Sequence, residues 1–466
     1  MRRTATWIMV IVAALMLSLA LFACGDDDDD DSGDGAGDDD DDNDDTAADD
    51  DDDNDDNNDD EWTPVEPHVE IYEGWQIVWL AGSAYDMGHQ QGTMLHAELG
   101  AGIDWLDQYH LIDILLPIAR LLGLIDMAVD NSYPDTLAEC RGLSDAAGDV
   151  GFTMEVCLLM NFGDVLVEFL GEGFPPALRG PGCTQVAAAG DATVDGRLYH
   201  ARGLDWSKID YLLDYPVIFV RQPDDGIPHT FIGFPGNLSP YSGMNAAGVT
   251  VASNEADPLN NTVHDRYGRS HVQMQAMLLK TAGSLQEAQE FILAQDHMTV
   301  ETIVVADAVA GEAAAFEMTG VGVGVRPLEQ GVVVATNHFV APETEDLDAE
   351  PAGASSLRRF TRATQLCGPD GDETHWGEID PGVLISVLRD RVNPDNGETT
   401  PPGVFDNDES IATNGAIYQM VFSGEDLCFW VSGGEIPVPE QTFVGFSLGE
   451  LLELPDAVAV DPLFYE

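Results

Sequence analysis

The spacing of apolar and polar residues predicts that helices dominate the front part of the chain. Residues 69–80 have the pattern of a strand, and residues 84–102 have the periodicity of an amphipathic helix. Residues 103–180 continue mainly as helix, with breaks expected near Pro134 and Pro175 because proline interrupts helical hydrogen bonding.

After Gly182 the pattern changes to short apolar segments of the length of buried strands. These segments are 184–189, 197–201, 216–221, 229–234, 248–253, 302–306, 313–317 and 331–336. Amphipathic helices are predicted at 270–294, 355–367 and 380–390. A helical portion followed by groups of strands with helices between them indicates an α+β fold, in which helices pack on sheets.

The N-terminus has the arrangement of a signal peptide. Arg2 and Arg3 precede an apolar run of 16 residues at 7–22, which is shorter than the roughly 20 residues of a membrane-spanning helix. The run ends in Leu-Phe-Ala followed by Cys24, a stretch that resembles a lipobox, in which the cysteine is acylated and becomes the mature N-terminus. We therefore expect an exported bacterial lipoprotein of the cell envelope, at the outer membrane or cell surface. An uncleaved anchor with an incidental cysteine is the alternative.

An acidic segment separates this leader from the rest of the chain. Residues 26–60 contain 23 Asp and no Lys or Arg, so they cannot bury apolar surface and are expected to form a disordered tether. The formal net charge of the whole chain is −67, and such a surface should repel nucleic acid. The expected divisions are a signal peptide at 1–24, a tether at 25–60, a helical portion at 61–182 and a catalytic portion at 183–466.

Cysteine usage leaves at least one free thiol if the chain is exported. Beyond Cys24 the cysteines are Cys140, Cys157, Cys183, Cys367 and Cys428, an odd number for an oxidising compartment. Two disulfides are possible if Cys183 stays free: Cys140 with Cys157, and Cys367 with Cys428. The sequence gives no distances that would decide between paired and free thiols.

The segment from Gly182 to Asp205 carries the strongest candidate chemistry. It predicts a strand that starts at Cys183, a turn at Asp195-Gly196 and a returning strand, so that Cys183 lies near Arg202 and Asp205. A guanidinium beside a thiol lowers the pKa of that thiol and favours the nucleophilic thiolate. The alternative is a buried structural cysteine near an ordinary surface ion pair.

Several short motifs along the chain resemble those of one enzyme family, in the same order. They are Ala84-Tyr85-Asp86-Met87-Gly88-His89-Gln90-Gln91-Gly92, Arg141-Gly142-Leu143-Ser144-Asp145-Ala146-Ala147-Gly148, Gly182-Cys183-Thr184, Arg202-Gly203-Leu204-Asp205-Trp206, Gly243-Met244-Asn245-Ala246-Ala247-Gly248 running on to Ser253-Asn254, Ala335-Thr336-Asn337-His338-Phe339, and Ser355-Ser356-Leu357-Arg358-Arg359-Phe360. No single motif is specific, but the ordered series is. The series resembles the acyl-coenzyme A:6-aminopenicillanic acid acyltransferase-like group of the N-terminal-nucleophile (Ntn) hydrolases, a group of cysteine enzymes related to the choloylglycine hydrolases, over about residues 70–455.

This resemblance implies a precursor that activates itself. Cys183 would attack the carbonyl of Gly182, and hydrolysis of the resulting ester-type link, a thioester, would leave Cys183 as the N-terminus of a second chain. A free α-amine has a pKa of about 7.7–8.0, so it can act as the general base for its own side chain. Gly182 lacks a Cβ and tolerates the backbone strain that this attack needs. Cys183 would then form a thioester with an acyl substrate.

The resemblance also assigns roles to five further residues. Asp205 would hold the α-amine, Arg202 would lie beside the thiolate, and Asn254 would donate to the tetrahedral oxyanion. Asn337 would orient the amine and the bound acyl group, and Arg359 would support the site through polar contacts.

Some of these assignments have alternatives. Asn254 and Asn337 could instead be ordinary turn residues. Arg359 could instead be a charge on the helix surface, in which case Arg358 or Arg362 would be the residue that supports the site. Gly203 stands where related enzymes often have asparagine, so one contact is in doubt. His200 and His338 are interpreted as structural, because the mechanism needs no histidine.

The fold implied is a four-layer αββα sandwich, and the activity implied is hydrolysis or acyl transfer at a linear amide bond. The partners implied are a small-molecule amide or acyl donor, the membrane through the lipid anchor, and the two self-cleaved chains for one another. Neither a cofactor nor a metal is implied, since the histidines and cysteines lack zinc spacing. Two alternatives remain open: a ceramidase-like hydrolase of lipid amides, and a binding lipoprotein that kept the fold without the chemistry.

Overall fold

The computed structural model describes residues 62–108, 111–162, 182–205, 210–348, 352–371, 373–401, 409–413, 415–460 and 463–464. The expected signal peptide, Cys24 and the acidic tether lie outside the described residues, as does Trp206. The chain divides into two units, residues 1–63 and residues 64–466, and every element below belongs to the second unit. Among the described residues, no helix combines the length and the apolar character needed to cross a membrane.

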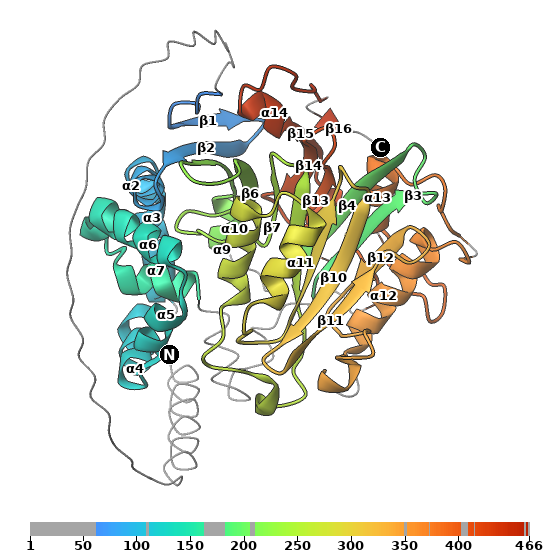
Figure 1. The fold of residues 1–466 in the computed structure, drawn as a ribbon, viewed down its shortest axis with the longest axis horizontal. Helices are drawn as coiled ribbons and strands as arrows, with labels where there is room; N and C mark the ends of the chain where they lie inside the picture. Colours follow the sequence, from blue (N-terminus) through green and yellow to red (C-terminus); the bar gives the residue numbers. More distant parts are fainter. Residues whose placement is uncertain are drawn as a thin grey trace, which may run out of the picture. The chain divides into compact units, whose positions relative to one another are not determined.

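Two sheets form the centre of this unit (Figure 1). The nine-stranded sheet has the order β1 (His68–Tyr72), β2 (Trp75–Gly82), β5 (Val217–Pro223), β6 (His229–Gly233), β7 (Ser242–Asn245), β8 (Val249–Glu255), β9 (Glu301–Asp307), β10 (Glu312–Thr319) and β11 (Gly322–Pro327). The seven-stranded sheet has the order β12 (Val332–Ala335), β3 (Thr184–Gly190), β4 (Gly196–Asp205), β13 (Ala416–Ser423), β14 (Cys428–Gly433), β15 (Phe443–Ser447) and β16 (Leu463–Phe464).

Small side chains fill the space between the two sheets. Ala187 and Ala189 of β3 share one buried cluster with Ala306 of β9 and Ala315 of β10. Inward-facing alanines leave little volume between the strands, so the two sheets pack closely face to face.

Helices cover the outer face of each sheet. On the nine-stranded sheet, α10 (His271–Thr281) and α11 (Leu285–Leu293) bury Leu278 and Ile292 against residues such as Phe219. On the seven-stranded sheet, α12 (Ala354–Cys367) and α13 (Pro381–Leu388) bury Leu366 and Leu384 against strand residues. The layers are therefore helix, sheet, sheet and helix, and the predicted αββα sandwich of the α+β class is confirmed.

The segment before Cys183 contributes both helices and strands. Its helices are α2 (Ala84–Met94), α3 (His96–Gln108), α4 (Leu116–Leu121), α5 (Leu124–Asn131), α6 (Pro134–Ala147) and α7 (Met154–Met160). Its two strands extend the nine-stranded sheet, where β2 pairs in parallel with β5 from Gln76↔Val217 to Gly82↔Pro223. The hydrogen-bond ladder between β2 and β5 thus joins the parts of the chain before and after Cys183.

Glycines let α2 and α6 approach closely. A Cβ on Gly88 would lie 2.1 Å from the carbonyl oxygen of Glu139, and a Cβ on Gly142 would lie 2.2 Å from that of Tyr85. Gly88 and Gly142, one from each of the first two sequence motifs, therefore serve helix packing, since any larger residue would force the helices apart. A disulfide between Cys140 and Cys157 then joins α6 to α7.

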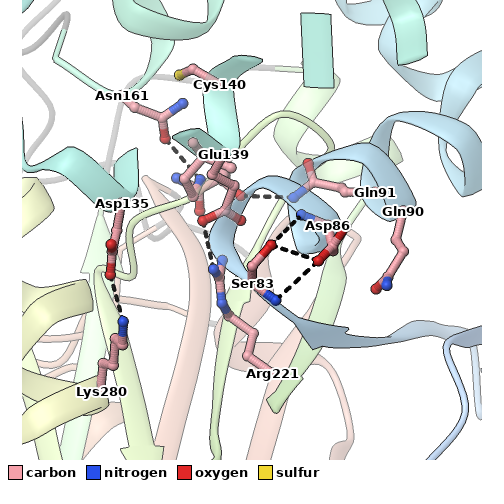
Figure 2. A network of polar contacts seen from close by, with 12 residues as sticks. Ser83, Asp86, Gln90, Gln91, Asp135, Glu139, Cys140, Asn161, Arg221 and Lys280 are labelled. Atoms are coloured by element: carbon pink, nitrogen blue, oxygen red, sulfur yellow. Dashed lines mark hydrogen bonds and ion pairs between the residues drawn. The ribbon is translucent and has the colours of Figure 1, made fainter. Parts of the chain in front are cut away.

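Polar contacts connect these helices to the rest of the unit (Figure 2). Arg221 of β5 donates to Glu139 of α6 at 2.6 Å, and both side chains are almost wholly buried. Lys280 of α10 pairs with Asp135 of α6 at 2.6 Å. A buried charge without its partner is costly, so the Arg221–Glu139 pair fixes how α6 lies on the sheet.

The element boundaries differ from the sequence predictions in three ways. The helix predicted over 84–102 is interrupted at Leu95, and the helix predicted over 270–294 is interrupted at 282–284, where Ser284 caps α11 by accepting from the backbone of Glu287. The strands β7, β11, β13, β14, β15 and β16 lay outside the predicted set. The single strand predicted over 69–80 is instead a hairpin of two antiparallel strands, β1 and β2, with a turn at Glu73-Gly74, and the other predicted strands are present.

Candidate active site

Cys183 immediately precedes β3, and the β3–β4 hairpin brings Arg202 beside it. The hairpin pairs Gln185 with Arg202, and its turn passes through Gly196 at φ +82°, a conformation that favours glycine. Arg202 Nη2 lies 3.4 Å from Cys183 Sγ and donates to the carbonyl of Ser253 at 2.8 Å. The predicted proximity of Arg202 to the thiol is therefore present in the fold.

Asn337 follows β12 and reaches the backbone of Cys183. Its Oδ1 accepts from the Cys183 N–H at 2.7 Å, and its Nδ2 donates to the carbonyl of Glu255 at 2.6 Å. Its own N–H donates to Ser356 Oγ at 2.8 Å. Because both ends of the amide are bonded, the Asn337 side chain has a fixed orientation at the nitrogen that processing would turn into an α-amine.

Arg359 projects from α12 onto the same group of atoms. Its Nη1 donates to the carbonyl of Cys183 and to Thr184 Oγ1, the latter at 3.2 Å, and its Nη2 donates to Asn337 Oδ1 at 2.8 Å. Although guanidinium groups are rarely buried, Arg359 is 1% exposed.

The two neighbouring arginines of α12 point elsewhere. Arg358 pairs with Asp395, and Arg362 pairs with Asp390 and Glu373. Of these three arginines, Arg359 is the one whose guanidinium donates to the carbonyl of Cys183.

Gly182 has a conformation and surroundings that exclude other residues. Its φ is +108°, and a Cβ there would lie 2.3 Å from Asn337 Oδ1 and 2.4 Å from Arg359 Nη2. Side-chain-bearing residues avoid this backbone region and have no room here. The peptide bond between Gly182 and Cys183 is therefore held against Asn337 and Arg359 in a form that only glycine permits.

The thiol of Cys183 is less acidic in the uncut chain than expected from Arg202 alone. Burial raises the pKa of Cys183, and the nearby Arg202 guanidinium offsets only part of that effect. Arg202 does lower the pKa of the Cys183 thiol, as expected, but burial raises that pKa by more. An α-amine at residue 183 exists only after cleavage, so the uncut chain also lacks that influence.

Asp205 is fully enclosed near the end of β4. Burial raises the pKa of its carboxyl to about 7, and the charges of Arg359 and Arg202 and a hydrogen bond with Thr413 oppose that rise. Near neutral pH this carboxyl thus exchanges a proton readily, within the positive field of two guanidinium groups.

Asn254 lies next to the site, and both ends of its side-chain amide are hydrogen-bonded. Its Nδ2 donates to the carbonyl of Thr336 at 3.2 Å, and its Oδ1 accepts from Gln185 Nε2 at 2.8 Å. Its neighbour Ser253 contacts Arg202 directly through the carbonyl described above. The fold therefore places Asn254 one residue from the immediate surroundings of Cys183.

Tyr418 on β13 was not identified from the sequence. The Arg202 guanidinium lies 5.6 Å from the centre of its ring, and its hydroxyl lies 2.7 Å from Ser242 Oγ on the opposite sheet. The aromatic face stabilises the cation beneath it. No local signal marked Tyr418, because its position depends on the pairing of β13 with β4.

Tyr418 also borders a small apolar cavity. The cavity has a volume of about 20 Å³, enough for roughly one water molecule, and its other lining residues are Trp75, Leu204, Leu212, Pro216, Ile232, Gly233, Phe234, Tyr241 and Ile417. Trp75 comes from the segment before Cys183, so both parts of the chain form this wall.

His200 and His338 both bond polar side chains other than the Cys183 thiol. His200 lies between Thr250 and Gln185, and burial lowers its pKa to about 3. His338 lies against Thr336 and Ser356, and burial lowers its pKa to about 4. Both rings are neutral near pH 7 and bond side-chain hydroxyl and amide groups, which is consistent with a structural role.

The cysteine pairing is settled differently for the two proposed disulfides. Cys140 and Cys157 are bonded, as one of the possible pairings had it, whereas Cys367 and Cys428 are free and buried, so that pairing was wrong. Cys367 is the last residue of α12, and Cys428 is the first residue of β14. Within the described ranges no group of three or more His, Cys, Asp or Glu side chains is placed to hold a metal ion.

The sequence is similar to one family and to two curated proteins. The family model described as acyl-coenzyme A:6-aminopenicillanic acid acyl-transferase matches residues 195–379. An uncharacterized protein of Archaeoglobus fulgidus is 25% identical over 197 residues, which are 39% of this chain and 33% of that protein. Protein dcd1B of Dictyostelium discoideum is 28% identical over 193 residues, 36% of each chain. The matched segments thus span about a third of these relatives.

Solved structures with similar architecture are more distant in sequence. The N-acylethanolamine-hydrolyzing acid amidase ortholog of Caenorhabditis elegans is 15% identical, with a TM-score of 0.37, over 57% of this chain and 99% of that one. A conjugated bile acid hydrolase of Clostridium perfringens is 13% identical, with a TM-score of 0.40, over 61% of this chain and 97% of that one. Penicillin V acylase of Agrobacterium tumefaciens is 15% identical, with a TM-score of 0.36, over 57% and 86%.

The family model covers the returning strand of the hairpin and runs through Arg202, Asp205, Asn254, Asn337 and Arg359. It begins after Cys183, so the match does not include that residue. The resemblance predicted from the sequence is confirmed: residues 195–379 match the model of the acyl-coenzyme A:6-aminopenicillanic acid acyl-transferase family.

Proposed function

We propose that this protein is an amidohydrolase or acyltransferase whose nucleophile is Cys183, made available by self-cleavage of the bond between Gly182 and Cys183. The observation that carries this proposal is the arrangement around that bond. Arg202 contacts the thiol, Asn337 accepts from the nitrogen, Arg359 donates to the carbonyl of Cys183, and Gly182 cannot be replaced without a clash. A merely structural cysteine requires none of these contacts.

Self-cleavage would begin when the Cys183 sulfur attacks the Gly182 carbonyl carbon. The bond from that carbon to the Cys183 nitrogen breaks, the nitrogen takes up a proton, and water then hydrolyses the thioester to a Gly182 carboxylate. The α-amine so formed lies where Asn337 Oδ1 now accepts from the peptide N–H. This amine then acts as the base for the Cys183 thiol, with the Asp205 carboxyl nearby to balance its charge.

In turnover, Cys183 would attack a linear amide and release the amine, and water or a second amine would resolve the thioester. Asn254 supplies the oxyanion donor, a contribution typically worth about 3 kcal/mol. The apolar cavity beside Tyr418 favours an apolar acyl group, which is the observation in support of a lipid-amide hydrolase as a second candidate. Its volume admits about one water, so an acyl chain requires the cavity to widen after processing.

The proposal is tested by intact mass and by turnover of a panel of straight-chain acyl para-nitroanilides. Wild-type protein should yield two chains and hydrolyse at least one panel member, and Cys183→Ala should remain one chain without activity. A binding lipoprotein that kept only the fold would remain a single chain in both forms. Activity in uncut Cys183→Ala protein would refute the nucleophile assignment.

We further propose that Cys24 is acylated and that the chain is exported to the cell envelope. The basic pair, the short apolar run and the lipobox-like stretch support this proposal, and two or three acyl chains give stable anchoring. The disulfide between Cys140 and Cys157 also fits an oxidising compartment. The acidic segment at 26–60 would then separate the enzyme from the membrane surface.

A further inference from the structure

A chain of hydrogen bonds runs between the two sheets and ends on Asn254. His200 Nδ1 lies 2.9 Å from Thr250 Oγ1, and His200 Nε2 lies 3.2 Å from Gln185 Oε1. Gln185 Nε2 donates to Asn254 Oδ1 at 2.8 Å, and Asn254 Nδ2 donates to the Thr336 carbonyl at 3.2 Å. All four side chains are fully buried, so water does not compete for these bonds.

The donor and acceptor of every hydrogen bond in this series follow from its last bond, the one to the Thr336 carbonyl. A backbone carbonyl only accepts, so the Asn254 atom facing Thr336 is Nδ2 and the atom facing Gln185 is Oδ1. Oδ1 also only accepts, so Gln185 presents Nε2 to it and turns Oε1 toward His200. His200 therefore carries its proton on Nε2 and accepts from Thr250 through Nδ1.

We propose that Gln185 and His200 are positioning residues that hold the Asn254 amide in the one orientation that can stabilise an oxyanion. This inference rests on the proposed function, in which Asn254 is the oxyanion donor. Asn254 Nδ2 carries two hydrogens, of which Thr336 takes one and the reacting carbonyl would take the other. If the amide rotated by half a turn, Oδ1 would face the developing negative charge and repel it.

Gln185 opposes that rotation because a flipped Asn254 would place its Nδ2 against Gln185 Nε2, donor against donor. Gln185 could flip in turn only by presenting Nε2 to the protonated Nε2 of His200. Apolar side chains pack between the sheets in one cluster, which includes Ala187, Leu198, Val304, Ala306 and Val333. A buried polar chain is costly unless it is fully bonded, and its far end lies at the candidate site.

The test is a double-mutant cycle between Gln185 and Asn254, measured on processed protein with the same acyl para-nitroanilides. Gln185→Leu should lower kcat about tenfold and leave KM nearly unchanged, because one hydrogen bond that orients the donor is lost. Gln185→Glu should do the same, since an ionised carboxylate cannot donate to Asn254 Oδ1. In an Asn254→Ala background, Gln185→Leu should cost less than about twofold, because its target is gone.

Thr302→Val is the matched control. Thr302 pairs with Asn254 across β8 and β9, is equally buried, and its hydroxyl has no hydrogen-bond partner within the described part of the chain. Its replacement should leave kcat unchanged. Equal losses from Gln185→Leu with and without Asn254, or a loss expressed in KM alone, would overturn the positioning role. Failure of the proposed function would be seen separately, as turnover that persists in Cys183→Ala.

Discussion

Gly182 and Asn337 are so close that a Cβ on the glycine would lie 2.3 Å from the amide oxygen of the asparagine. That oxygen also accepts from the nitrogen of the bond that self-cleavage would break. The same contact therefore selects glycine and holds the nitrogen of the expected leaving group.

Gly182→Ala should block or greatly slow processing. The added methyl group would displace Asn337 or Arg359, and φ +108° is unfavourable for alanine. Mass spectrometry over time should show a single chain. Gly311→Ala separates the two effects, because Gly311 also has positive φ, +68°, but its Cβ would meet nothing within 4 Å. The Gly311 variant should be processed at the wild-type rate, and equal rates for both variants would argue against the steric role of Gly182.

Sequencing of the purified protein should find a second N-terminus that reads Cys183-Thr184-Gln185. The Cys183→Ala variant should show only the N-terminus of the uncut chain, because it has no sulfur to attack the Gly182 carbonyl. Cys367→Ala, which replaces another buried free cysteine, should be cut normally. Processing lost in the Cys367 variant and kept in the Cys183 variant would reverse the assignment.

The Asp205 carboxyl should make the free energy of unfolding of uncut Cys183→Ala protein fall, relative to that of the Asp205→Asn variant in the same background, as the pH rises from about 4 to about 7. The Asp205 carboxyl has a pKa of about 7 in the fold and an ordinary value of 3.8, so over this range the unfolded chain loses the proton while the folded chain keeps it. Proton release from the unfolded state favours unfolding, by up to about 4 kcal/mol in total, and the effect is constant above pH 7.

Urea unfolding of both proteins at several pH values measures this difference, which cancels the opposite effect of buried histidines such as His200. Asp126→Asn, at an exposed position of α5, should not show this dependence on pH when compared with the same parent protein. A difference between the Asp205 variant and its parent that stays constant from pH 4 to pH 7 would contradict the raised pKa of Asp205.

A limiting amount of alkylating reagent should label Cys183 first in processed protein. Cleavage gives Cys183 an adjacent amine, whereas burial raises the pKa of Cys367 to about 12 and that of Cys428 to about 11. Peptide mapping should show label on Cys183 in proportion to the activity lost. In the uncut Gly182→Ala protein, where burial raises the pKa of Cys183 as well, labelling of Cys183 should be much slower.

Cys24→Ser should move the protein from the membrane fraction to the soluble fraction of cells. Loss of the acylated cysteine removes the apolar chains that bind the bilayer. Cell fractionation and detection of the chain measure the outcome. Replacement of Ser32, in the neighbouring acidic segment, should leave fractionation unchanged; membrane association that survives loss of Cys24 would count against lipidation.

The sequence was sufficient to place Cys183 beside Arg202, because a hairpin is a local structure with a recognisable turn. It was sufficient for the αββα architecture through the family resemblance. It left Arg358, Arg359 and Arg362 undecided, because that choice depends on how α12 lies across β3.

Long-range pairing accounts for what the sequence did not reveal. Tyr418 reaches Arg202 only because β13 pairs with β4, and β13 was not predicted. The raised pKa of the Cys183 thiol also depends on burial in the packed interior, which the sequence does not show. Arg202 alone suggested a lowered pKa. Cys367 and Cys428 are both free, because Cys367 packs in the apolar cluster of α12 and α13 whereas Cys428 lies on β14, and spacing along the chain does not encode this placement.

If the chain is cut before Cys183, the parallel pairing of β2 with β5 becomes a contact between two separate polypeptides. The Cys140–Cys157 disulfide lies wholly on one side of the cut, so no described covalent bond joins the two pieces. Refolding the mature protein would then be a second-order reaction between two molecules, dependent on concentration, although the precursor folds as one. The lifetime of the mature enzyme would thus depend on the rate at which its two chains dissociate. At high dilution, a single unfolding event would inactivate it irreversibly.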